Sequence, residues 1–192
     1  MNSFETQIAF FKIISNNKIQ KKYKTQYQHL FQYTIFKELL NINSYQIINL
    51  YEIDINSKAM IYEYFPSVNL RERLKSYQQI SYKDLIQIFI DMASSIDFLH
   101  KNNIAHIDIN DTNFLINTNL EIKLNDYDFI EILNEKNQAL KQIDILAFAL
   151  MIYRIIQLPY QWNAVKNLEF EYSHNNLNYT TCINFLNSLN LK

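Results

Sequence analysis

The sequence contains no glycine and only two prolines in 192 residues. Glycine normally occupies backbone positions with a positive φ, because it has no Cβ to clash there. Turns that need this conformation must use other residues, and asparagine and aspartate tolerate it best. We therefore expect these two residue types at the tight turns. A loop that wraps bound phosphates with its backbone is excluded in its usual glycine-rich form.

Cysteine and net charge are also scarce. A single cysteine, Cys182, excludes an internal disulfide framework and suits a reducing compartment. A net charge of −1 and a pI near 6.4 give no sign of a surface for nucleic acid or anionic membranes. The lysine cluster at residues 18–24 is local, and we interpret it as a solvated helix face. These features predict a cytoplasmic protein that binds neither nucleic acid nor membrane.

Long apolar runs are missing as well. The longest uncharged one, at residues 145–153, is too short to span a bilayer and is typical of a helix buried on all sides. No basic-then-apolar signal pattern opens the chain. Hydrophobic residues make up 48% of the sequence, which suffices for one domain or for two small lobes around a cleft.

The clearest predicted element is a helix at residues 81–102. Ser81 followed by Asp84 forms a capping-box start, and Asn102 with Asn103 can end the helix. Apolar residues recur along it at spacings of four and three: Leu85, Phe89, Met92, Ile96 and Leu99. The remaining patterns predict a strand at 8–14, a polar segment leading into a helix at 16–42, a hairpin at 47–53 and 58–65, and helices at 145–158 and 180–191.

Three polar side chains stand at the ends of short apolar runs. Asp108 and Asn113 are five residues apart, and Asp126 follows Asp108 by eighteen residues. Phosphoryl transfer needs a carboxylate to orient the nucleophile, and an amide with a second carboxylate to hold Mg²⁺. The alternative is that these residues only cap helices and make turns.

The flanking residues resemble the protein kinase family. The resemblance covers about residues 8–160 and rests on three runs: AMIYEYFPSVNLRERL at 59–74, DMASSIDFLHKNNIAHIDINDTNFLINTNLEIKLNDYDF at 91–129, and QIDILAFALMIYRIIQLPY at 142–160. They are similar to the hinge, to the catalytic loop with its metal-binding turn, and to the central helix of the large lobe. The implied fold is α+β with two lobes, a partial sheet-rich lobe lacking the first strands at 1–65 and a helical lobe at 66–192.

The resemblance also assigns roles to individual residues. Asp108 would orient the attacking hydroxyl, and Asn113 and Asp126 would hold Mg²⁺. The backbone of Glu63, Tyr64 and Phe65 would form the hinge that meets the adenine of ATP. Asp144 resembles the aspartate that hydrogen-bonds the catalytic-loop backbone.

The strand lysine and its partner are harder to assign. Lys12 is the residue that the resemblance points to for contacting the phosphates, with an edge-strand lysine facing water as the alternative. Kinases pair this lysine with a glutamate on the following helix. The ungapped alignment puts Ile35 at that position, and Glu38 lies three residues further on. Glu38 could pair with the strand lysine, and the alternative is that it is an exposed surface residue.

Four departures from the family pattern bear on activity. Ile107 replaces an arginine that reads a regulatory phosphate, and Asn110 replaces a lysine that neutralises the transferred group. Asp128 follows Asp126 and Tyr127 where the family has glycine. Asp144 comes only eighteen residues after Asp126, and no Ala-Pro-Glu sequence follows.

Three functions remain open from the sequence. The first is ATP- and Mg²⁺-dependent phosphoryl transfer to a protein serine or threonine hydroxyl, in a weakened form. The second is a pseudokinase that binds or scaffolds a protein partner. The third is a small-molecule kinase of the aminoglycoside phosphotransferase type. The sequence leaves the oligomeric state open.

Overall fold

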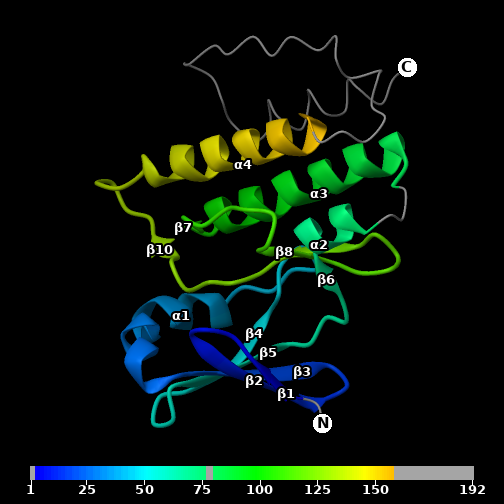
Figure 1. Ribbon diagram of the computed structural model, residues 1–192. Coiled ribbons are helices and arrows are strands. Elements are labelled where there is room, and N and C mark those ends of the chain that lie inside the picture. The colour runs from blue at the N-terminus through cyan, green and yellow to red at the C-terminus, as the bar shows by residue number, and fades with distance from the viewer. Residues whose placement is uncertain (1–2, 77–79, 158–192) are drawn as a thin grey trace.

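The computed structural model describes residues 3–76 and 80–157 (Figure 1). Its first half is an antiparallel sheet of five strands in the order β1-β2-β3-β5-β4. The strands are β1 (Ser3–Glu5), β2 (Ala9–Ser15), β3 (Lys18–Tyr23), β4 (Leu50–Asp54) and β5 (Ala59–Glu63). A 3₁₀ helix, η1 (Thr25–Leu30), and the helix α1 (Tyr33–Leu40) connect β3 to β4. We call residues 3–63 the sheet lobe.

The second half, residues 68–157, is the helical lobe. Its helices are α2 (Leu70–Lys75), α3 (Tyr82–Lys101) and α4 (Leu140–Gln157), and α3 and α4 lie side by side in Figure 1. Two small antiparallel sheets accompany them: β6 (Val68–Asn69) with β8 (Phe114–Ile116) and β9 (Ile122–Leu124), and β7 (Ile104–Ala105) with β10 (Glu131–Ile132). The α+β class with two lobes is therefore confirmed.

The helix α3 forms as its sequence predicts. The Ser81 side chain accepts a hydrogen bond from the Asp84 amide at 3.1 Å and so caps the first turn. All five periodic apolar residues of this helix are buried. Beyond the Asn102 cap, Asn103 has a φ of 57°, the left-handed conformation that asparagine tolerates. This helix packs against the strands β7 and β9.

Two expectations about the sheet lobe are wrong. The first strands are not lacking, because β1 and β2 precede β3. The strand at residues 8–14 is therefore the second of the sheet. The lysine cluster at 18–24 is the strand β3 and not a helix face, with Lys21 and Tyr23 buried and Lys18 and Lys22 exposed. This alternation has the period of two that a strand requires.

The two lobes share one hydrophobic core, and backbone hydrogen bonds join them. The segment before β4 runs beside β9, where the Ile48 amide donates to the Leu124 carbonyl at 2.9 Å. The Leu124 amide in turn donates to the Gln46 carbonyl at 3.0 Å. A single cluster of buried apolar residues spans both lobes. The site described below lies along this junction.

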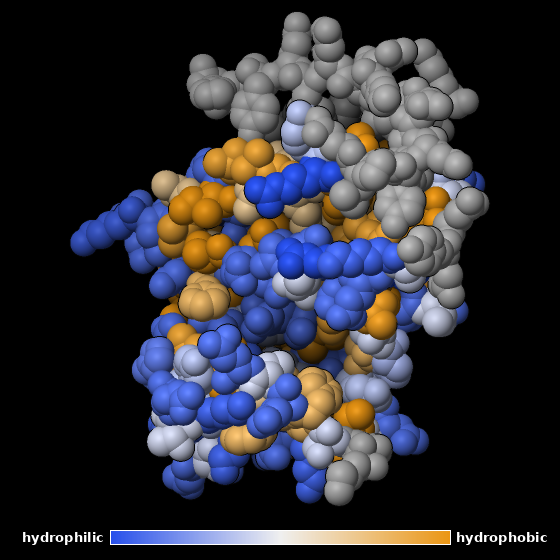
Figure 2. Space-filling view, in the orientation of Figure 1, coloured by the Kyte–Doolittle hydropathy of each residue, from blue (hydrophilic) through white to orange (hydrophobic). Residues whose placement is uncertain are grey.

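The helix α4 differs from its expectation. It is not buried all round, because Leu146, Leu150 and Tyr153 are about half exposed at 49%, 46% and 56%. Figure 2 shows hydrophobic side chains at the surface over this helix. No helix within residues 3–76 and 80–157 has the length and apolar character needed to cross a bilayer. The helix predicted at 180–191, with Cys182, lies outside the described residues.

Candidate functional site

Asp108 and Asn113 meet in the loop between β7 and β8. The Asn113 side-chain amide donates to the Asp108 carbonyl and to its Oδ2, both at 2.8 Å. The Asn110 side chain donates to Asp108 Oδ1 at 2.9 Å. Asn113 is only 6% exposed, since Phe114 beside it enters the core as the first residue of β8. The predicted pair is thus brought together, with the Asp108 carboxylate oriented by two amides.

A buried carboxylate holds the start of this loop. Asp144, which is fully buried at the start of α4, accepts hydrogen bonds from the amides of His106 at 2.8 Å and Ile107 at 2.7 Å. Its Oδ2 also lies 2.7 Å from His100 Nε2. Buried carboxylates need such donors because their desolvation is unfavourable. The expected contact of Asp144 with the catalytic-loop backbone is confirmed.

Ile107 has a strained backbone. Its φ is 69°, an outlier for a β-branched residue, which costs of order 1–3 kcal/mol. The expectation that asparagine and aspartate serve the positive-φ positions holds for Asn103 and Asp126 but fails for Ile107, Leu120 and Lys58. At Ile107 the short hydrogen bond to Asp144 compensates the strain. The hydrogen bonds to Asp144 thus hold the turn that precedes Asp108.

The turn after β9 brings Asp126 to the same loop. The Asn125 amide donates to the Asn113 carbonyl at 2.8 Å, which ties this turn to the Asp108 loop. Asp126 follows with a φ of 64°. Its Oδ1 lies 3.2 Å from the ammonium of Lys21 on β3. Asp126 therefore stands at the junction, between the catalytic-loop candidate and a lysine of the sheet lobe.

Lys21 has a second and closer carboxylate partner. Its Nζ lies 2.5 Å from Oδ1 of Asp128, and the Tyr23 hydroxyl donates to the same oxygen at 2.5 Å. Lys21 and Asp128 are only 5% and 2% exposed. Burial raises the pKa of Asp128, an effect that the Lys21 ammonium opposes. Burial first, and then the Asp128 charge, raises the pKa of the Tyr23 hydroxyl, so this group stays a hydrogen-bond donor.

The lysine expected from the sequence is not the one at the site. Lys12 lies on β2, is exposed and pairs in register with Ser3 and Gln20. Glu38 is also exposed, and neither residue forms an ion pair within the described part of the chain. The alternation of Ile19, Lys21 and Tyr23 was the signal that could have identified the correct strand.

Tyr127, the residue after Asp126, is buried and contacts both lobes. Its hydroxyl lies within hydrogen-bonding distance of the Ile48 carbonyl, at 2.8 Å, and of the Leu124 carbonyl, at 2.9 Å. Its ring packs on Tyr62 and on His106. The buried His106 places Nε2 2.9 Å from the Asn125 carbonyl, and burial lowers its pKa. A neutral, hydrogen-bonded histidine in this place braces the Asp126 turn.

The three hinge candidates differ in whether their backbone amides have a hydrogen-bond acceptor. The Glu63 amide donates to the Asn49 carbonyl at 2.8 Å, and the Tyr64 amide donates to Asn17 at 2.9 Å. The Phe65 amide has no acceptor within the described residues. The Glu63 carboxylate is held by the Lys123 ammonium at 2.6 Å. Of the three amides, that of Phe65 can therefore serve a ligand.

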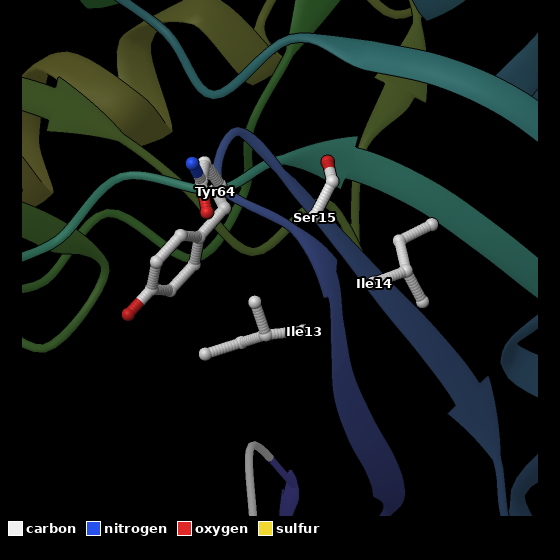
Figure 3. A pocket seen from close by; sticks show the side chains of 5 residues that line it. Ile13, Ile14, Ser15 and Tyr64 are labelled. Carbon is white, nitrogen blue, oxygen red and sulfur yellow. The ribbon is translucent and has the colours of Figure 1, made fainter.

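A hollow of about 380 Å³ lies at the hinge end of the sheet lobe. Tyr64 and the end of β2 line it, and in Figure 3 the side chains of Ile13 and Ile14 point to opposite sides of their strand. None of the polar residues around Asp126 lines this hollow. Figure 2 shows hydrophilic side chains along the boundary between the lobes instead. The polar cluster around Asp126 and the hollow are thus separate features of the structure.

The oxygens of Asn113 and Asp126 could hold a divalent cation. Asn113 turns its amide nitrogen to Asp108. Its side-chain oxygen accepts only a long contact from the Thr112 hydroxyl, at 3.5 Å, and keeps a lone pair for a cation. Asp126 uses one carboxylate oxygen for Lys21, and the other has no partner among the described residues. Within residues 3–76 and 80–157, no group of three or more His, Cys, Asp or Glu residues gathers as a metal cluster. Mg²⁺ fits this set, because it takes one or two protein ligands and completes its shell with water and phosphate.

Comparisons with known proteins show the family of this chain. The family model described as the protein kinase domain matches residues 1–177. A probable serine/threonine-protein kinase of Clostridium acetobutylicum is 29% identical over 91 residues, which cover 46% of this chain and 14% of the relative. The serine/threonine-protein kinase SIK1 of Mus musculus is 27% identical over 128 residues, 65% of this chain and 16% of the relative. The chain thus spans a small part of the length of these relatives.

Proposed function

The chain belongs to the protein kinase domain family, and from this premise we propose that it transfers a phosphoryl group from ATP, with Mg²⁺, to a serine or threonine hydroxyl of a protein. One observation carries the proposal: Asp108 and Asn113 are hydrogen-bonded to each other, and the adjacent turn presents Asp126 to a buried lysine. Phosphoryl transfer is catalysed mainly by positioning and electrostatic stabilisation, which such a cluster can supply.

The roles of the residues follow from their contacts. Asp108 accepts the proton of the attacking hydroxyl, since its carboxylate is oriented by Asn110 and Asn113. Asn113 and Asp126 offer the oxygens for Mg²⁺, which neutralises phosphate charge when bound. Lys21 takes the phosphate-binding role that the sequence assigned to Lys12.

The hinge supplies the adenine contact in this proposal. The Phe65 amide is the open donor of the segment at Glu63, Tyr64 and Phe65, so it would donate to a ring nitrogen of the base. The serine/threonine kinases among the relatives support the choice of acceptor. The division at residues 65 and 66, the protein substrate and a cytoplasmic location belong to the same proposal.

Nucleotide binding is the first test. The purified chain is titrated with Mg·ATP by calorimetry, beside Asp126→Asn and the control Asp97→Asn, which changes a partly exposed aspartate of α3 paired with Lys101. We expect Asp126→Asn to weaken binding by about tenfold or more, because a charged ligand is lost, and Asp97→Asn to have no effect. An absence of binding by the wild type with both Mg²⁺ and Mn²⁺ contradicts the proposal.

Phosphoryl transfer is the second test. Asp108→Asn should lower transfer to a serine peptide by about 10²–10⁴-fold while leaving Mg·ATP affinity close to that of the wild type. Turnover is followed with labelled ATP and a peptide library. Transfer to small alcohols but not to peptides would instead identify a small-molecule kinase.

A pseudokinase is the second candidate, and Asn110 favours it. This residue stands where the resembling kinases have a lysine, and it donates to Asp108 rather than neutralising a phosphate. The turn between β1 and β2 is also short, closed by the Thr6 amide donating to Ala9, and contains no glycine. Nucleotide binding without transfer, unaffected by Asp108→Asn, would support this candidate.

A further inference from the structure

The turn after β9 carries a carboxylate that kinases of the resembling pattern do not have. Asp128 stands at the glycine position of that pattern and is 2% exposed. Its Oδ1 accepts from both Lys21 and Tyr23 at 2.5 Å. Its other oxygen is buried without a partner within the described residues. The Asp128 side chain therefore binds the lysine on β3. A role in forming the turn would not explain this contact.

The helix α1 offers no competing carboxylate. The position aligned with the family glutamate is Ile35, which is partly buried and packs on the hydrophobic core. Glu38 is exposed, and Lys21 forms its ion pairs with Asp126 and Asp128. A buried ammonium needs such partners, because its desolvation is otherwise too unfavourable.

We propose that Asp128 is the positioning residue of Lys21, in place of a helix glutamate. The proposal rests on the proposed function, because it assigns how the phosphate-binding lysine of that site is held. An ammonium has three N–H donors. Two face Asp128 and Asp126, which leaves the third for a phosphate oxygen. The site is then assembled by the turn at 126–128, and a movement of α1 does not break it.

The test compares Asp128→Asn with Glu38→Gln, the same change of charge on α1. Affinities for Mg·ADP and for adenosine are measured on the full chain, because Lys21 acts only on the phosphate-bearing ligand. We expect Asp128→Asn to weaken Mg·ADP by about tenfold and to leave adenosine unchanged. Glu38→Gln should change neither affinity. Asp128→Gly, which restores the family residue, should behave as Asp128→Asn does.

The opposing results are distinct. A loss with Glu38→Gln as large as that with Asp128→Asn assigns the role to α1 and overturns the proposal. No change or tighter binding of Mg·ADP in both Asp128 variants overturns it as well. An equal loss for both ligands shows that Asp128 only supports the fold.

A ligand-free measurement separates this proposal from the proposed function. Unfolding temperatures are compared for Lys21→Met, Asp128→Asn and the double variant. We expect the double variant to lose clearly less than the sum of the single losses, because the two residues act as a pair. Lys12→Met combined with Asp128→Asn is the control and should be additive. Additive losses for Lys21→Met and Asp128→Asn would overturn the pairing. If the wild type only fails to bind nucleotide, the proposed function is overturned and the pairing is not.

Discussion

Lys21 carries a charge although the residue is only 5% exposed, so its ammonium needs partners within the protein. Its ammonium is held by two carboxylates and lies 5.0 Å from the centre of the Tyr23 ring. Each of these contacts offsets part of the desolvation of the charge. A lysine stabilised in this way is kept for its charge rather than for packing.

The first prediction compares the two candidate lysines. Lys21→Met should weaken Mg·ATP binding by about tenfold or more, since it removes the cation that faces the phosphates in the proposed function. Lys12→Met should leave the affinity unchanged, because Lys12 is an exposed residue of β2. Calorimetry on the two variants decides between them. A larger effect of Lys12→Met would return the role to the lysine expected from the sequence.

His106 is the second residue with a measurable consequence. Burial lowers its pKa below the ordinary 6.5, although the carboxylates of Asp144, Asp126 and Asp108 oppose this shift. The unfolded chain therefore binds a proton that the folded chain does not, as the pH falls below about 6.5. This contribution to stability is complete at higher pH and is lost on acidification.

The prediction is a smaller pH dependence when His106 is replaced. Between pH 7.5 and 5.5 the wild type should lose more unfolding free energy than His106→Asn, by up to about 1.4 kcal/mol for each pH unit. Urea unfolding at both pH values measures this difference. The exposed His29→Asn is the control and should match the wild type. Equal losses for His106→Asn and the wild type would contradict the prediction.

At the scale of elements, α3 and β3 show where local patterns suffice. The caps and apolar stripe of α3 are local, since each residue interacts with others three or four positions away. The strand β3, in contrast, depends on contacts with segments that are distant in the sequence. Its lysines read as a solvated helix face, and only pairing with β2 and β5 makes it a strand.

The cap of α3 gives a prediction at this scale. Ser81→Ala removes the acceptor of the Asp84 amide and should lower the unfolding free energy by about 1 kcal/mol. Ser94→Ala, in the middle of the same helix, is the control. It removes a hydroxyl that bonds the Ile90 carbonyl and should cost little, because alanine favours a helix. Chemical denaturation of both variants checks the difference, and equal losses would refute the capping role.

At the scale of the molecule, polar contacts hold the two lobes in one arrangement. Lys123 on β9 donates to Glu63 on β5 at 2.6 Å, and both side chains are largely buried. Asn49 donates to the second oxygen of Glu63 at 3.0 Å. The hinge is thus fixed to the strand that precedes Asp126. The geometry of the site depends on this link between lobes.

The corresponding prediction concerns the Lys123–Glu63 pair. Lys123→Met leaves a partly buried carboxylate without its cation and should cost roughly 1–3 kcal/mol of unfolding free energy. The double variant with Glu63→Gln should recover part of this loss. Lys101→Met, which breaks the exposed pair with Asp97, should cost much less. Thermal unfolding of the wild type, both single variants, the double variant and Lys101→Met gives the comparison. Strict additivity at Lys123 and Glu63 would contradict the pairing.

The sequence by itself determined the elements and motifs whose interactions are short in range. The helix α3, the loop with Asp108 and Asn113, and the turn with Asp126 follow from spacing and caps, together with the resemblance of their flanks. Only the tertiary structure decided which lysine lies beside Asp126 and Asp128. Lys12 pairs with Gln20 and Lys21 pairs with Phe11, so the two lysines face opposite sides of the sheet. Strand register sets this choice, and register arises from contacts between segments that are distant in the chain.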